Sequence, residues 1–139
     1  MRNIIELNEE QIDEVCEKLS AYNRNFIGYR LSGSVCIGIE EDRRLIAGLT
    51  GYMTAFKILY IDTVFVEKEF RQRGIGTSLI REAERRAKEL GANMIRLDTF
   101  NWQGRDFYNK LGYEEVGSYS SPEDGFSEHF FLKRIKEDT

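Results

Sequence analysis

Two short β-like runs enclose one long helical pattern in the middle of the chain, and this order constrains the fold more than any other feature. Residues 59–66 and 94–99 are rich in β-branched and apolar residues. Between them, apolar residues recur every three or four positions, the spacing of one helix face: Ile75, Leu79, Ile80, Ala83, Ala87 and Leu90. Such a segment closes by a right-handed crossover, so we expect the two strands to lie parallel and adjacent.

Strand patterns continue on both sides of this segment. Each further run is apolar or alternating and ends at a turn signal: 34–40, 45–54, 113–119 and 126–134. The first two should form an antiparallel meander with 59–66. Two more helices are predicted, one capped by Asn8 and running to about Ala21, the other over 102–111. The apolar pair Ile4–Ile5 is interpreted as an edge strand.

Length and composition predict one domain over residues 1–139. The chain has 41% hydrophobic residues and a single proline, without a repeat or a low-complexity stretch. A chain of this size buries about two thirds of its unfolded surface in one core. We therefore expect no linker and no second domain.

The net charge limits the kinds of partner the protein can have, and the absence of targeting signals indicates its cellular location. The formal net charge is -4, from 20 basic and 24 acidic residues, which argues against nucleic acid as a partner and suits a cationic substrate. The sequence shows no secretory signal and no membrane-spanning run, so a cytoplasmic location is expected. Cys16 and Cys36 are then predicted to be free, buried thiols. No metal site is predicted.

A glycine turn preceded by basic residues joins residues 59–66 to the long helix. The turn lies within residues 71–77, whose sequence is RQRGIGT. Glycine lets a backbone approach a ligand closely, and the first amides of a helix are unpaired donors that the helix dipole reinforces. The turn is therefore predicted to hold an anion, and a pyrophosphate is the natural candidate.

Two familiar phosphate loops are excluded by the residues that they lack. A Walker A loop would continue with Gly-Lys-Ser/Thr, which is absent, and the dinucleotide fingerprint would need a glycine where Leu79 stands. A tight strand-to-helix turn without any ligand remains the alternative interpretation of two glycines alone.

Two motifs together resemble the Gcn5-related N-acetyltransferase (GNAT) family. Its acetyl-CoA loop has the pattern Arg/Gln-x-x-Gly-x-Gly/Ala between a strand and a long helix, which here is Arg71, Gly74 and Gly76. Asn101 and the run 107–113 (FYNKLGY) look like the family's asparagine followed by F-Y-x-K-x-G-F/Y. The resemblance covers about residues 34–119 and is looser before them.

The resemblance implies a fold and an activity. The fold would be α/β (α+β): a mixed, mostly antiparallel sheet of six to seven strands with helices on both faces and a splayed parallel central pair. The activity would be transfer of an acetyl group from acetyl-CoA, as co-substrate, to a primary amine of a small molecule or a peptide. A non-catalytic acetyl-CoA-binding regulatory module is the alternative. Many members of the family are dimers, so a homodimer also stays open.

The resemblance also assigns cofactor contacts. The pantetheine arm would enter between the two parallel strands and pair with backbone. The family motifs place cofactor-binding residues at Val64, Phe65, Val66, Arg71, Gln72, Arg73, Gly74, Ile75, Gly76, Thr77, Asn101 and Lys110. In this scheme the pyrophosphate lies on the amides of the glycine turn, and Lys110 lies near the nucleotide phosphate.

Catalysis would need an acid for the leaving thiolate and a base for the amine. Tyr108 matches the family's tyrosine acid, and its alternative role is packing. Asp62 interrupts an apolar strand and is our candidate base, because an acid at such a position needs a partner or a function. Asp98, Glu128, His129 or a water chain remain alternatives for the base.

Overall fold

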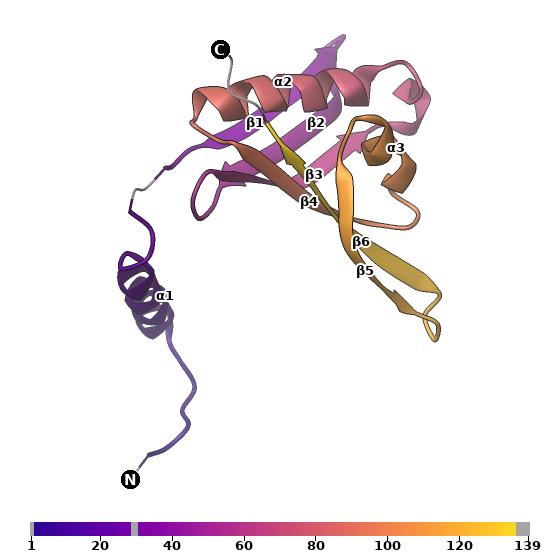
Figure 1. The fold of residues 1–139 in the computed structure, drawn as a ribbon. Coiled ribbons are helices and arrows are strands. Elements are labelled where there is room, and N and C mark those ends of the chain that lie inside the picture. The colour runs from indigo at the N-terminus through magenta and orange to yellow at the C-terminus, as the bar shows by residue number, and fades with distance from the viewer. Residues whose placement is uncertain (1, 29–30, 136–139) are drawn as a thin grey trace. The chain divides into compact units, whose positions relative to one another are not determined.

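A computed structural model describes residues 2–28 and 31–135 of the chain. The chain divides into two compact units, residues 1–30 and 31–139 (Figure 1). Within residues 2–28 the first unit holds one helix, and the second unit holds the sheet together with the glycine turn and every candidate site residue.

The first unit consists of helix α1 (Glu9–Asn23) and the segment before it. Asn8 caps it as predicted, within a capping box: the Gln11 N–H donates to Asn8 Oδ1 over 2.9 Å, and the Asn8 N–H donates to Gln11 Oε1 over 3.0 Å. The helix ends two residues beyond the predicted Ala21. The predicted edge strand at Ile4–Ile5 is wrong, since residues 2–8 form no strand and both isoleucines are exposed. Two apolar residues without a pairing strand do not hold an extended ladder.

The second unit is built on a six-stranded mixed sheet with the order β1-β2-β3-β4-β6-β5. Its strands are β1 (Ser34–Glu41), β2 (Arg44–Met53), β3 (Ile58–Val66), β4 (Met94–Phe100), β5 (Glu114–Ser121) and β6 (Phe126–Arg134). Only the central pair β3–β4 is parallel, and every other neighbouring pair is antiparallel. The predicted α/β fold with a mixed, mostly antiparallel sheet and one parallel, adjacent central pair is therefore confirmed.

Helices α2 (Ile75–Glu89) and α3 (Arg105–Lys110) pack against the same face of this sheet, because both contribute to one core cluster and touch each other at Gly76 and Phe107. The prediction of helices on both faces is therefore not met by these two helices. The apolar stripe of α2 is buried as its period predicted, with Leu79, Ile80, Ala83 and Ala87 all in the core. They meet buried strand residues such as Leu59, Ile95 and Phe131. Burial of apolar surface on this face is the main stabilising contribution to the unit.

Helix α3 begins three residues later than the sequence predicted. The loop 101–104 precedes it, because Gln103 Oε1 accepts a hydrogen bond of 2.7 Å from the Phe100 N–H and closes a turn there. Trp102 lies in this loop, 66% exposed, with its ring stacked on Phe100. The polar side chain of Gln103 thus competes successfully with helix formation.

The two cysteines are free, as predicted, but the prediction that they are buried is wrong. Cys36 is exposed on the outer strand β1, where alternate residues face solvent, and Cys16 is exposed on α1. No helix in residues 2–28 or 31–135 is long and apolar enough to cross a membrane.

Candidate active site

The two parallel strands separate after four paired positions. β3 and β4 pair from Ile58↔Met94 to Ile61↔Leu97, although β3 continues to Val66 and β4 to Phe100. Beyond the last pair, the edge of β3 that faces β4 has no partner strand. Peptide groups on this edge that lack a strand partner can pair with a ligand. The Val66 carbonyl already accepts a hydrogen bond from Arg71.

A β-bulge accompanies the separation. The register of β2 with β3 shifts between Thr50↔Thr63 and Gly51↔Ile61, so Asp62 is the extra residue. A bulge bends its strand and increases the local twist, and this bulge falls at the position where the pairing of β3 with β4 ends. Asp62 is exposed at this point and accepts a hydrogen bond of 2.6 Å from Thr50 Oγ1.

The glycine turn follows β3 and begins α2. Gly74 is the N-cap residue, in the left-handed conformation with φ 80°, and a side chain added there would meet nothing within 4 Å. The first helical hydrogen bond runs from the Ser78 N–H to the Gly74 carbonyl, so the amides of residues 75–77 have no acceptor within the helix. No side chain caps this end and no acid lies in the first turn. These amides therefore form an open anion site.

Two arginines add positive charge beside this turn. Arg71 donates from Nε to the Val66 carbonyl over 2.8 Å, and its guanidinium lies 5.5 Å from the centre of the Phe65 ring. Arg73 lies 5.6 Å from the centre of the Phe70 ring. Contacts of this kind hold the guanidinium groups near the anion site instead of leaving them free in solvent.

The second glycine of the turn packs closely against a neighbouring helix. A side chain at Gly76 would meet Phe107 Cζ at 3.1 Å, so this residue lets α3 approach the beginning of α2. Gly74 and Gly76 therefore have different roles. Gly74 allows the turn, and Gly76 allows the contact between two helices. That contact brings α3, with Tyr108, next to the anion site.

Tyr108 is 8% exposed and packs among Phe107, Tyr113 and Phe131. Its ring also lies over Gly104, where a side chain would meet it at 3.2 Å. Burial raises the pKa of Tyr108 to about 12. The phenol therefore holds its proton at neutral pH but is a weaker acid than a thiol, whose pKa is ordinarily about 8.5.

Asn101 follows β4 and is fixed to β6. Its N–H donates to the Ser127 carbonyl over 3.0 Å, and its Oδ1 accepts from the Ser127 N–H over 2.9 Å. Because the oxygen of this amide is occupied, its NH₂ group is the part left to bind a ligand. Lys110 is exposed at the end of α3.

The candidate bases lie in different surroundings. Asp62 and Asp98 are the next residues of their strands after the last pair, Ile61↔Leu97, and so flank the separation. Asp98 accepts a hydrogen bond of 2.8 Å from the Tyr60 hydroxyl. Burial and this hydrogen bond raise the pKa of Tyr60 to about 12.

Glu128 and His129 lie on β6, where they pair with Phe100 and Thr99 of β4. Glu128 accepts a hydrogen bond from the Tyr119 hydroxyl. His129 is 5% exposed, and both of its ring nitrogens face neighbouring polar groups, Ser127 and Glu115. A side chain so enclosed cannot reach an incoming amine directly.

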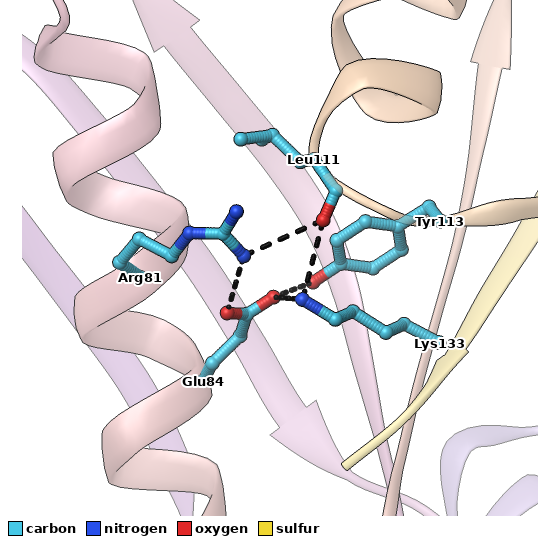
Figure 2. A network of polar contacts seen from close by, with 5 residues as sticks. All are labelled: Arg81, Glu84, Leu111, Tyr113 and Lys133. Atoms are coloured by element: carbon cyan, nitrogen blue, oxygen red, sulfur yellow. Dashed lines mark hydrogen bonds and ion pairs between the residues drawn. The ribbon is translucent and has the colours of Figure 1, made fainter.

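A polar network ties α2 to the turn after α3 (Figure 2). Glu84 accepts hydrogen bonds from Arg81, Lys133 and the Tyr113 hydroxyl, and both cations also donate to the Leu111 carbonyl. Burial acts to raise the pKa of Glu84, but these donors outweigh it and hold the pKa below its usual value. Burial also raises the pKa of Tyr113, and Glu84 adds to the effect.

The fold thus brings most of the predicted site residues to one end of the parallel pair. The unpaired edge 62–66 is the carboxyl-terminal part of β3. The glycine turn follows β3, and Asn101 and Tyr108 follow β4. Sequence reasoning missed the partners Thr50, Tyr60 and Gly104, because each acts on a residue distant in sequence or through space that only the fold creates. The alternation of β2 and β3 could have suggested Thr50 beside Asp62.

Comparisons with known proteins agree with the fold and with the arrangement of the site. The model of the acetyltransferase (GNAT) family matches residues 2–113. Blasticidin-S acetyltransferase from Streptomyces morookaense is 30% identical over 96 residues, which are 68% of this chain and 70% of that protein. A crystal structure of an acetyltransferase from Bacillus cereus ATCC 14579 superimposes with a TM-score of 0.88 at 31% identity, covering 96% of this chain and 98% of that one.

A structure with a bound cofactor has the same fold. It is described as a streptothricin acetyltransferase from Bacillus anthracis str. Ames in complex with acetyl coenzyme A. The TM-score is 0.65 at 20% identity, over 81% of this chain and 67% of that one. At this identity the likeness concerns the fold alone.

The fold and the relatives define an enzyme of the acyltransferase class. The chain belongs to the acetyltransferase (GNAT) family and is an N-acetyltransferase.

Proposed function

We propose that the enzyme uses acetyl-CoA as co-substrate and acetylates a primary amine of a small molecule or a peptide. The observation that carries this proposal is the separation of β3 from β4 directly before the open helix N-terminus of α2. An unpaired strand edge suits the amides of a pantetheine arm, and free helix amides suit a diphosphate. Acetyl-CoA contains both groups, joined in this order.

The cofactor would extend from the glycine turn into the gap between the strands. The diphosphate would accept hydrogen bonds from the amides of the turn, with Gln72, Arg73 and Thr77 around it. The pantetheine arm would pair with the edge Val64, Phe65 and Val66. From the other side, the Asn101 NH₂ group would donate to a carbonyl of the arm, and Lys110 would lie near the nucleotide phosphate.

The reaction would take place where the strands part. An uncharged amine attacks the thioester carbonyl, the new C–N bond forms, and the C–S bond breaks to release CoA and the acetylated amine. The amine must lose one proton before or after the attack, and the thiolate gains one. Asp62 is the proposed acceptor of the amine proton, because it lies exposed on the bulge at the end of the paired strands. Asp98, on the opposite strand, or a water could take its place.

Tyr108 is the proposed donor to the departing sulfur. Its burial raises its pKa to about 12, which makes full proton transfer to a thiolate unfavourable. A hydrogen bond from the neutral phenol nevertheless stabilises the charge that develops on sulfur in the transition state. We therefore assign Tyr108 the role of hydrogen-bond donor, with the proton reaching sulfur finally from solvent.

The acceptor is proposed to be a basic amine. Asp62 and Asp98 flank the reaction centre, and the chain carries a net charge of -4, which attracts cations. A relative at 30% identity is named for acetylating blasticidin S. The cytoplasmic location expected from the sequence stays a prediction.

The proposal is tested by following free thiol while the purified full chain is incubated with acetyl-CoA and a panel of amines. The panel should contain antibiotics with free amines, polyamines, lysine and a peptide with a free N-terminus. We expect at least one amine to raise thiol release well above hydrolysis. Tight binding of acetyl-CoA without release for any amine would instead favour a regulatory module, and failure to bind acetyl-CoA would reject the proposal.

A further inference from the structure

A continuous polar chain runs beneath the loop 101–104 and joins its two ends. It begins at Asn101, which is paired with Ser127 through two backbone-directed hydrogen bonds. It continues from Ser127 to His129 and from His129 to Glu115. It ends at Arg105, the first residue of α3, which forms a two-bond fork to Glu115 with distances of 2.8 and 3.1 Å.

His129 is the central member of this chain and its most buried one. Its Nε2 shares a hydrogen bond of 2.8 Å with Ser127 Oγ. Its Nδ1 lies 2.7 Å from Glu115 Oε1 but is not aligned for a hydrogen bond, and among the described residues it is the one buried side-chain polar atom without one. The contact with Glu115 becomes an ion pair when the imidazole is protonated. An imidazole 5% exposed is thus held by a serine on one side and a carboxylate on the other.

The segment that this chain holds has few other anchors. Asn101 and Trp102 are exposed. The other anchors of the loop are the Trp102 ring, which stacks on Phe100, and Gln103, which exchanges two hydrogen bonds with the backbone of Phe100. A loop of this kind samples many conformations unless its ends are fixed, and ligand binding must then supply the ordering. The polar chain fixes both ends through two strands of the sheet.

We propose that His129 is a positioning residue for the cofactor. It holds Ser127, and through Ser127 it holds the Asn101 amide with its NH₂ group directed to the pantetheine arm; through Glu115 and Arg105 it also fixes the start of α3. This inference rests on the proposed function, because it takes Asn101 as a cofactor ligand. It also removes His129 from the list of candidate bases and gives it a different role in the same reaction.

Two conservative substitutions test the contacts of the two imidazole nitrogens separately. A glutamine amide reaches the place of Nε2, so His129→Gln keeps the Ser127 contact and loses the Glu115 contact. An asparagine amide reaches the place of Nδ1, so His129→Asn does the reverse. We expect His129→Asn to raise the KM for acetyl-CoA about three- to tenfold, with kcat changed less than about twofold, and His129→Gln to restore most of the affinity.

Two further variants guard against a purely structural effect. Ser127→Ala removes the same link from the other side with a smaller change, and it should raise the KM like His129→Asn. Ile95→Val removes one methylene from a fully buried position of β4 outside the polar chain, and it should lower the melting temperature without raising the KM. The Kd for CoA, measured by calorimetry, should follow the KM.

A double-mutant cycle with Asn101→Ala decides the mechanism. If His129 acts through Asn101, His129→Asn adds no further loss of CoA affinity in the Asn101→Ala background. Full additivity, a loss of kcat with unchanged KM, or an equal rise of KM in Ile95→Val would each overturn the inference while leaving the proposed function intact. No CoA binding by the unaltered protein would overturn both.

Discussion

The two glycines of the turn, Gly74 and Gly76, are needed for different physical reasons. Gly74 adopts φ 80° beside open space, whereas Gly76 lies against Phe107. A sequence motif does not distinguish the two glycines. In the structure, glycine is favoured at position 74 by its left-handed backbone, and at position 76 by the close contact with Phe107. The two positions should therefore respond differently to substitution.

Gly76→Ala should destabilise the protein by about 1 to 3 kcal/mol, because its new methyl group lies 3.1 Å from Phe107 Cζ. Phe107→Leu should relieve much of this loss. Gly74→Ala should cost about 1 kcal/mol through its left-handed backbone, and Phe107→Leu should not relieve it. Urea unfolding of the single and double variants measures both effects; equal relief at the two positions would contradict the assignment.

Tyr108→Phe should lower kcat by about 100-fold, since one donor to the developing charge is lost. The Kd for CoA should change less than about twofold. Tyr113→Phe is the matched control, because its hydroxyl donates to Glu84 over 2.9 Å and should affect stability more than turnover. Thiol release and calorimetry report the two quantities, and normal turnover in Tyr108→Phe would remove the hydroxyl from the mechanism.

At the scale of elements, α3 is short and depends on its neighbours. A helix of six residues has little stability of its own, so its position comes from tertiary contacts. The polar chain around His129 holds its first residue, and the Glu84 network holds the turn after its last one (Figure 2). Tyr108 therefore lies on an element that is fixed at both ends.

Glu84→Gln should destabilise the second unit by about 2 to 3 kcal/mol at pH 7, because three donors lose a charged acceptor. The pKa of Glu84 is lowered in the folded protein, so its contribution is fully present above its unfolded value of 4.5 and is lost as pH falls through the folded value. The difference between the original protein and Glu84→Gln should therefore shrink below about pH 4.5. Urea unfolding at a series of pH values from 7 to 3 measures it; a constant difference would contradict this account.

The separated strands predict a local response to the cofactor. Amides within residues 62–66 that face β4 lack a strand partner and should exchange their hydrogens quickly in the free protein. CoA should slow this exchange, whereas amides of β1 should change little. Exchange followed by mass spectrometry or NMR provides the measurement, and unchanged rates at saturating CoA would argue against pairing of the arm with this edge.

At the scale of the whole molecule, a ligand that binds only the folded state raises its stability. At a CoA concentration 100 times the Kd, the gain is about 2.7 kcal/mol, which corresponds to several degrees in Tm for a chain of this size. ATP carries phosphates but no pantetheine arm, so it should raise the Tm less. An equal shift with ATP would indicate that the glycine turn alone binds the ligand.

Much of the fold could be predicted from the sequence because its signals are local. The alternation of β1 and the period of α2 are visible within each segment, and both elements lie within one residue of their predicted bounds. The Ile4–Ile5 strand and the burial of Cys16 and Cys36 were predicted wrongly, since pairing and burial depend on neighbours that no short segment contains.

The candidate site, too, has parts that local sequence predicts and parts that depend on contacts between distant residues. The glycine turn and its place before a long helix could be predicted, because consecutive residues determine the backbone conformation of both. Which acid flanks the gap, and which histidine nitrogen faces which partner, depends on strand register and on a bulge at Asp62. Those contacts join residues far apart in the chain, so only tertiary packing decides that His129 is enclosed while Asp62 is exposed.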